Sequence, residues 1–127
     1  MNRFCFQSSK FKPVPNEDKY TNPGIYGKEC AEWLADELKN IGYTIKEIVP
    51  EDWGWCIILD GFDTYSYWIG CNGEYYDDHL IWSCFVSVDE PFFKNPFKTY
   101  NKNDVVKSIE ADVLKILNEN FVLIECP

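Results

Sequence analysis

Large apolar residues in the first third of the chain recur with the period of a helix. They stand at intervals of four, four, four and three residues, with polar positions between them. The residues are Tyr26, Cys30, Leu34, Leu38 and Ile41. This spacing places them on one face, so a helix is predicted over about 24–41. Asn22 and Pro23 suit its start, and Gly42 suits its end.

The pattern of the middle of the chain is that of strands. Strands are predicted over 43–49, 53–59, 64–71 and 80–88. The third alternates, which places Tyr65, Tyr67, Ile69 and Cys71 on one face. Asn72-Gly73 after it predicts a tight turn. The short connections between these runs favour an antiparallel meander.

The remaining segments complete a single domain over 1–127. They are a short strand over 3–8, a loop over 92–101, a helix from Asn103 or Asp104 to near Asn120, and a final strand over 121–126. The predicted order is β-α-β-β-β-β-α-β. This order indicates an α+β fold, in which two helices pack on one face of a largely antiparallel sheet.

The cysteines and the hydropathy indicate in which cellular compartment the protein is expected. The 127 residues are 46% hydrophobic and 17% aromatic, enough for a core that needs no disulfides. The N-terminus has no apolar segment typical of a signal peptide, and no apolar run reaches the roughly 20 residues of a membrane span. The six cysteines stand singly in apolar segments. We therefore expect a cytoplasmic protein with six reduced thiols and no membrane association.

The net charge of −9 is concentrated in the middle of the chain. Residues 47–93 contain ten acids and no Lys or Arg, so this segment carries −10 and the rest of the chain +1. Such a field repels nucleic acid and attracts basic partners. The same segment holds twelve aromatic residues, and Tyr and Trp are frequent anchors of protein interfaces.

The stretch PEDWGW, residues 50–55, offers an acid pair and two tryptophans. Glu51 and Asp52 could act as a general acid and base, but adjacent strand residues point to opposite faces, so a polar turn is the favoured interpretation. Trp53 and Trp55 would share one face of a regular strand. We expect at least one of them in the core. If the other face of the sheet is open, Tyr65, Tyr67 or Trp68 could be exposed on it.

The segment from Glu74 to His79 contains oxygen ligands and the one histidine. A metal site could combine Asp77, Asp78 and His79 with Asp60 or Asp63, but the spacing of a calcium loop is absent. A solvated hairpin loop is the favoured interpretation. We expect no metal and no cofactor.

Two stretches carry a resemblance. TNPGIYGKECAEWL and PEDWGW resemble a family of small uncharacterised bacterial proteins with a TNPG…YG…AEWL helix followed by a PEDWGW strand. The resemblance covers about the first half of the chain and fades after Cys71. It implies a bacterial, cytoplasmic, single-domain protein, and it carries over no activity and no catalytic residues.

Two hypotheses of function follow. The first is a small acidic protein-binding domain, such as an inhibitor or immunity-type protein, that binds a basic protein partner and neither nucleic acid nor membrane. Its candidate binding residues are Glu51, Asp52, Trp53, Trp55, Asp60, Asp63, Tyr65, Tyr67, Asp77, Asp78 and His79. The alternative is a small enzyme or ligand-binding domain with an aromatic pocket near Trp53, Trp55 and Tyr67. A flat acidic face favours the first, and a closed apolar pocket favours the second.

Overall fold

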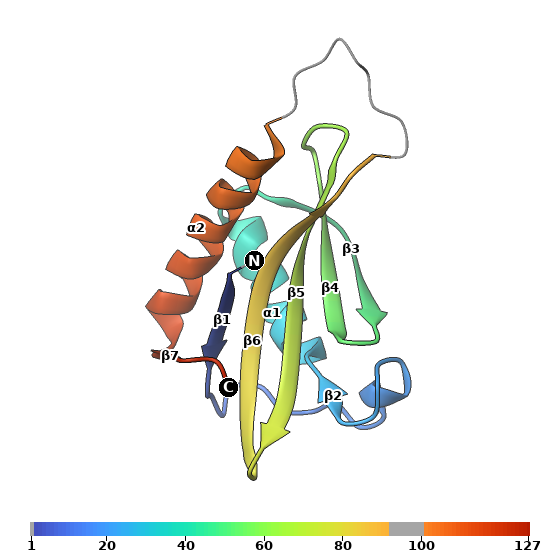
Figure 1. The fold of residues 1–127 in the computed structure, drawn as a ribbon, viewed down its shortest axis with the longest axis vertical. Coiled ribbons are helices and arrows are strands. Elements are labelled where there is room, and N and C mark those ends of the chain that lie inside the picture. Colours follow the sequence, from blue (N-terminus) through green and yellow to red (C-terminus); the bar gives the residue numbers. More distant parts are fainter. Residues whose placement is uncertain (1, 92–100) are drawn as a thin grey trace.

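The computed structural model describes residues 2–91 and 101–127, and within them the chain forms an α+β fold with an antiparallel sheet (Figure 1). The predicted fold class is confirmed. The elements are β1 (Arg3–Phe6), a 3-10 turn η1 (Glu17–Lys19), β2 (Ile25–Tyr26), α1 (Lys28–Asn40), β3 (Thr44–Glu51), β4 (Gly54–Asp60), β5 (Ser66–Tyr76), β6 (His79–Asp89), α2 (Lys102–Asn120) and β7 (Leu123–Ile124).

The sheet is built on a meander with the N-terminal strand added beside it. The strand order is β3-β4-β5-β6-β1-β7, β2 pairs with β5, and every pair is antiparallel. The hairpin of β5 and β6 is the longest element pair and runs nearly the length of the molecule (Figure 1). Side chains of this hairpin contribute to both faces of the sheet.

One set of alternating strand positions forms the core together with both helices. Tyr65, Tyr67, Ile69 and Cys71, which were predicted to share one face, are all buried, and Leu34 of α1 and Val113 of α2 belong to the same cluster. α1 contacts β3, β4 and β5, whereas α2 contacts β6. Both helices contribute side chains to this one cluster, and their packing on a single face of the sheet stays a prediction. No helix in the described part of the chain is long and apolar enough to cross a membrane.

The first helix begins later than predicted and ends as predicted. Asn22 and Pro23 lie in a turn, closed by the hydrogen bond that Ile25 N donates to Asn22 O at 3.0 Å, and the helix begins at Lys28. At its end Gly42 has φ +103°. Gly42 N donates to Lys39 O and Tyr43 N donates to Leu38 O, each at 3.0 Å, so the helix closes with a Schellman motif.

The turn predicted at Asn72-Gly73 is wrong. Both residues lie inside β5, opposite Ser83 and Trp82, and the chain reverses at Asp77 and Asp78, whose φ values are +47° and +67°. Packing explains the glycine, because a Cβ on Gly73 would lie 2.4 Å from the Trp82 ring. Asn72 instead uses its side-chain amide to donate to Trp53 O at 2.6 Å.

In the C-terminal part, α2 begins slightly before its predicted start and ends as predicted, whereas the final strand is shorter than predicted. The loop predicted over 92–101 lies outside the described residues except for Asn101, which precedes α2. The final strand contains Leu123–Ile124 alone. Beyond it Cys126 turns back toward β1.

A disulfide joins Cys5 of β1 to Cys126, with the two Cα atoms 5.3 Å apart. The prediction of six free thiols is therefore wrong for this pair. Cysteines that are 121 residues apart in sequence are brought together when the end of the chain pairs with β1. The other four, Cys30, Cys56, Cys71 and Cys84, are free and buried.

This disulfide predicts a definite count of thiols. Alkylation of the unreduced, denatured protein should modify four cysteines, and reduction should lower the free energy of unfolding by about 2–4 kcal/mol because the cross-link restricts the unfolded chain. Mass spectrometry and denaturant titration measure the two effects. A Cys5→Ser/Cys126→Ser variant, whose stability should not respond to reductant, is the control. Six modified cysteines in the unreduced protein would contradict the pairing.

Candidate functional site

The PEDWGW stretch places its two tryptophans on opposite faces of the sheet. Asp52 and Trp53 form the turn between β3 and β4, and β4 begins at Gly54, whose φ is +149°. Trp55 is 7% exposed and belongs to the core, as predicted for at least one of the pair. Trp53 contacts Trp68 and Phe85 instead. The two rings do not share a face because the turn interrupts the alternation of a regular strand.

A buried carboxylate fixes this stretch to the N-terminal segment. Glu17 is 3% exposed, and its Oε1 accepts hydrogen bonds from Gly27 N at 2.8 Å, Lys28 N at 3.0 Å and Trp55 Nε1 at 3.0 Å. It thus caps the N-terminus of α1 and holds the indole of β4 at the same time. Asn22 N also donates to Asp52 O at 2.9 Å. The stretches TNPGIYGKECAEWL and PEDWGW therefore contact each other in the folded chain.

Three aromatic rings form a cluster on the face of the sheet opposite the core, which we call the outer face. The Trp53 and Trp68 rings are stacked, with centroids 5.4 Å apart and an interplanar angle of 22°. The Phe85 centroid lies 5.1 Å from that of Trp53 and 5.7 Å from that of Trp68. Gly70 makes room for this arrangement, because a Cβ there would lie 2.3 Å from the Phe85 ring. Trp53 and Trp68 are half-buried, so part of each ring faces solvent.

A hollow of about 260 Å³ adjoins the two tryptophans. It is lined by Glu51, Trp53, Cys56, Ile58, Ser66, Trp68 and Asp89. Its floor is apolar, and its rim carries the exposed carboxylates of Glu51 and Asp89.

The negative charges at the rim affect the pKa of the Cys56 thiol, which lies in the floor of the hollow. Its pKa is raised to about 12, first by burial and then by three carboxylates. These belong to Glu51, Asp89 and Glu47. Negative charge from β3 and β6 therefore converges on the hollow, and a cation placed there would be favoured.

The indole of Trp68 has an unusual environment. Its Nε1 is buried and has no hydrogen-bond partner among the described residues. An unpaired buried donor costs about 1–3 kcal/mol and is rare in folded proteins. The unpaired Nε1 belongs to Trp68, so this energetic cost arises at a residue that lines the hollow.

The edge of the sheet beside the hollow is poorly suited to adding another strand. β3 is the edge strand, the register shifts between Ile45 and Glu47, and Pro50 lacks an N–H. A bulge and a proline are typical devices that prevent pairing at an edge. Addition of a further strand at β3 is therefore disfavoured.

The structure separates the residues predicted to bind. Glu51, Asp52 and Trp53 lie beside the hollow, whereas Trp55, Tyr65 and Tyr67 are buried in the core. Asp60 and Asp63 belong to the turn region between β4 and β5, where Asp63 accepts hydrogen bonds from Tyr65 N at 2.8 Å and Tyr67 Oη at 3.0 Å. Asp77, Asp78 and His79 form the far turn between β5 and β6. Trp53, Trp55 and Tyr67 accordingly do not line one pocket.

Six residues of the hollow and the aromatic cluster were not among the predicted binding residues, although Trp68 was expected to be exposed if this face were open. They are Cys56, Ile58, Ser66, Trp68, Phe85 and Asp89. The alternation of β5 and β6 contained a signal for two of them, because Trp68 and Phe85 stand between the core positions of their strands. Their meeting with Trp53 depends on the pairing of β4, β5 and β6, which a local pattern does not specify.

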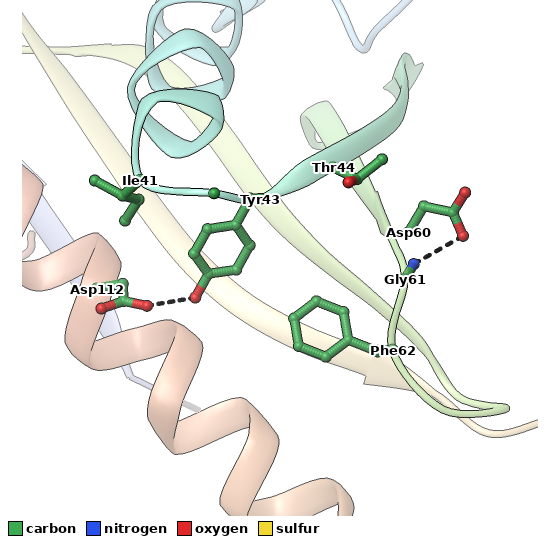
Figure 2. A pocket seen from close by; sticks show the side chains of 8 residues that line it. Ile41, Tyr43, Thr44, Asp60, Gly61, Phe62 and Asp112 are labelled. Carbon is green, nitrogen blue, oxygen red and sulfur yellow. Dashed lines mark hydrogen bonds between the residues drawn. The ribbon is translucent and has the colours of Figure 1, made fainter.

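A second hollow, of about 310 Å³, lies where α1 ends (Figure 2). Ile41 and Tyr43 line it from the connection between α1 and β3, Phe62 from the turn after β4, and Asp112 from α2. Asp112 accepts a hydrogen bond from Tyr43 Oη at 2.5 Å, and Asp60 accepts one from Gly61 N at 2.9 Å. Burial, and then the hydrogen bond to Asp112 and its charge, raise the pKa of Tyr43. Each carboxylate of this hollow already has an internal donor.

Comparisons of the chain with protein-family models, curated proteins and solved structures gave no match. The choice between the two hollows therefore rests on geometry and charge. The outer face combines partly exposed tryptophans with a carboxylate rim, and we take it as the candidate site.

Proposed function

We propose that the protein is a binding domain that holds a basic segment of a protein partner on the outer face of its sheet. The observation that carries this proposal is the stacked Trp53–Trp68 pair beside a hollow rimmed by Glu51 and Asp89. Tryptophan is the residue most enriched among interface anchors, and an acidic rim selects a cationic partner.

An arginine or lysine side chain fits this chemistry best. A guanidinium placed over an indole face gains about 0.5–2 kcal/mol, more when water is excluded. The same group could donate to the carboxylates of Glu51 and Asp89 at the rim. The chain's own Arg3 already lies over an aromatic ring on the same face, since its Cζ is 4.8 Å from the centroid of the Phe85 ring.

The acids of the middle segment support the same kind of partner at longer range. Nine of the ten acids between residues 47 and 90 are exposed, and Glu74 is partly exposed. Most of them lie on strand ends and turns, and together they create a negative field that accelerates encounter with a basic protein. An inhibitor of a basic enzyme, of the immunity type, is the role that we propose for such a surface.

The cytoplasmic location is also part of the proposal. Four buried free thiols favour a reducing compartment, whereas the Cys5–Cys126 disulfide is more typical of an oxidising one. The thiol count in protein isolated from its native cell, with free thiols blocked at lysis, tests this point directly.

An NMR titration with a short arginine-rich peptide tests the binding face. The indole N–H signals of Trp53 and Trp68 should shift, whereas those of the core residues Trp55 and Trp82 should stay in place. A peptide of the same length with glutamate in place of arginine should produce no shift. Shifts confined to the far turn at 77–79, or to the hollow of Figure 2, would contradict the proposal.

Matched variants distinguish the contribution of the hollow to peptide binding from that of the general negative field. Glu51→Gln/Asp89→Asn should weaken peptide binding by about tenfold or more, which corresponds to about 1.4 kcal/mol. Asp77→Asn/Asp78→Asn removes the same charge from the far turn and should change the affinity by less. Equal losses in both variants would show that the field alone attracts the peptide and that the hollow has no part in binding.

A further inference from the structure

Three of the four free thiols meet in the core, on the face of the sheet opposite the proposed binding site. Cys30 of α1, Cys71 of β5 and Cys84 of β6 are each 0% exposed. Cys84 Sγ lies 3.9 Å from both Cys30 Sγ and Cys71 Sγ, and all three sulfur atoms lie within 4.8 Å of one another. Among the described residues, no other group of three His, Cys, Asp or Glu ligand atoms gathers so closely.

The positions of these thiols follow from the topology. Cys71 and Cys84 are directly opposite each other in the antiparallel pair of β5 and β6, so their side chains share one face. Cys30 lies in the first turn of α1, which packs over the same strands. Three rigid elements thus fix the three sulfur atoms, which is the arrangement that a precise ligand set requires.

Two of the three distances between the sulfur atoms match those of a three-coordinate metal thiolate. Three sulfur atoms at about 2.3 Å from a central ion in a plane are about 4.0 Å apart. The two shortest sulfur–sulfur distances here are both 3.9 Å. An ion could therefore be bound with small adjustments of side chains and without separating the strands.

The donor set selects the class of ion. All three ligands are soft sulfur atoms, which disfavours calcium and magnesium because both require oxygen. Structural zinc takes four ligands, whereas this group offers three. Cu(I) prefers thiolates. We propose that Cys30, Cys71 and Cys84 form a buried site for a single Cu(I) ion.

Binding at such a site is coordination without a change of oxidation state. Copper enters and stays as Cu(I), and each thiol that becomes a thiolate releases its proton to solvent. The competing interpretation is that the three cysteines are small core hydrophobes. The two interpretations differ in whether the folded protein binds copper and in how many sulfur atoms surround it.

The test uses the full chain with its Cys5–Cys126 disulfide intact, under anaerobic conditions, with Cu(I) delivered from a coloured chelator. One Cu(I) per chain should transfer to the protein, and X-ray absorption should show three sulfur neighbours. The bound ion should raise the unfolding midpoint, because the folded state holds the three thiols together and so binds the ion more tightly than the unfolded chain does. No transfer in competition with the chelator, or coordination by nitrogen or oxygen, would overturn the site.

Two variants locate the ion. Cys84→Ala should lower the Cu(I) affinity by more than about 100-fold, since even groups outside a ligand set contribute about 10–100-fold. Cys56→Ala removes the buried free thiol of the outer face and should leave the affinity unchanged. Loss in Cys56→Ala, or retention in Cys84→Ala, would place the copper elsewhere. If Cys84→Ala does not fold, Cys30→Ala serves in its place, and the sulfur count of the wild-type protein still decides.

Discussion

Replacing Glu17 by alanine is expected to destabilise the protein by about 3–5 kcal/mol, because an unpaired buried donor costs about 1–3 kcal/mol. The carboxylate is 3% exposed and accepts hydrogen bonds from Gly27 N, Lys28 N and Trp55 Nε1. Its other oxygen accepts one from Val14 N at 2.6 Å. Alanine leaves these donors without a partner and removes the cap of α1. Chemical denaturation followed by circular dichroism measures the change.

Two further variants distinguish the contribution of the hydrogen bonds to stability from that of the negative charge. Glu17→Gln keeps one acceptor oxygen but presents an amide group to the other donors, so its loss should be smaller than that of Glu17→Ala. Glu32→Gln removes one negative charge from the exposed surface of α1 and should change stability by less than about 0.5 kcal/mol. If Glu17→Ala matched Glu32→Gln, the carboxylate would have no role in joining the N-terminal segment to β4.

Gly54→Ala is expected to cost about 3–5 kcal/mol, through backbone strain of about 1–3 kcal/mol and a steric conflict of about the same size. Gly54 has φ +149°, and a Cβ there would lie 2.4 Å from Cys71 O. That atom belongs to the backbone of a central strand, so it cannot move aside without disturbing the pairing of β5. The thermal unfolding midpoint should fall accordingly, and the near-UV circular dichroism of the aromatic cluster should weaken.

Gly61→Ala is the matched control for this substitution. Gly61 also has a positive φ, +86°, but a Cβ there meets no atom within 4 Å. It should therefore show only the conformational cost of a left-handed residue, about 1–2 kcal/mol. Equal effects at the two positions would mean that close approach of the chain to Cys71 does not restrict residue 54.

The helices, the strands of the meander and the core face were predictable from periodicity. The alternation of Tyr65, Tyr67, Ile69 and Cys71 and the stripe of α1 reflect burial on one side, which repeats along a regular element. Helix and strand ends were less predictable. The start of α1 depends on Glu17, a residue eleven positions away from Lys28, and no local capping pattern indicates it.

Two errors have a common physical cause. Asn72-Gly73 has the composition of a hairpin turn, yet Gly73 is there because the Trp82 ring lies against it. Cys5 and Cys126 stand in apolar segments like the other cysteines, yet strand pairing at the two ends of the chain brings them together. In both cases the residue type is explained by a contact between segments that are distant in sequence. A short stretch of sequence does not contain that contact.

The sequence by itself determined the fold class, the core positions and the concentration of acids without bases between residues 47 and 93. These are properties of local periodicity and composition, which act through burial and net charge. Only the tertiary structure decided that Trp53 joins Trp68 and Phe85 on the outer face, while Trp55 enters the core beside Glu17. It also decided that three thiols from α1, β5 and β6 meet. Such groupings require the register of paired strands and the packing of a helix over them, and both are fixed by the whole chain.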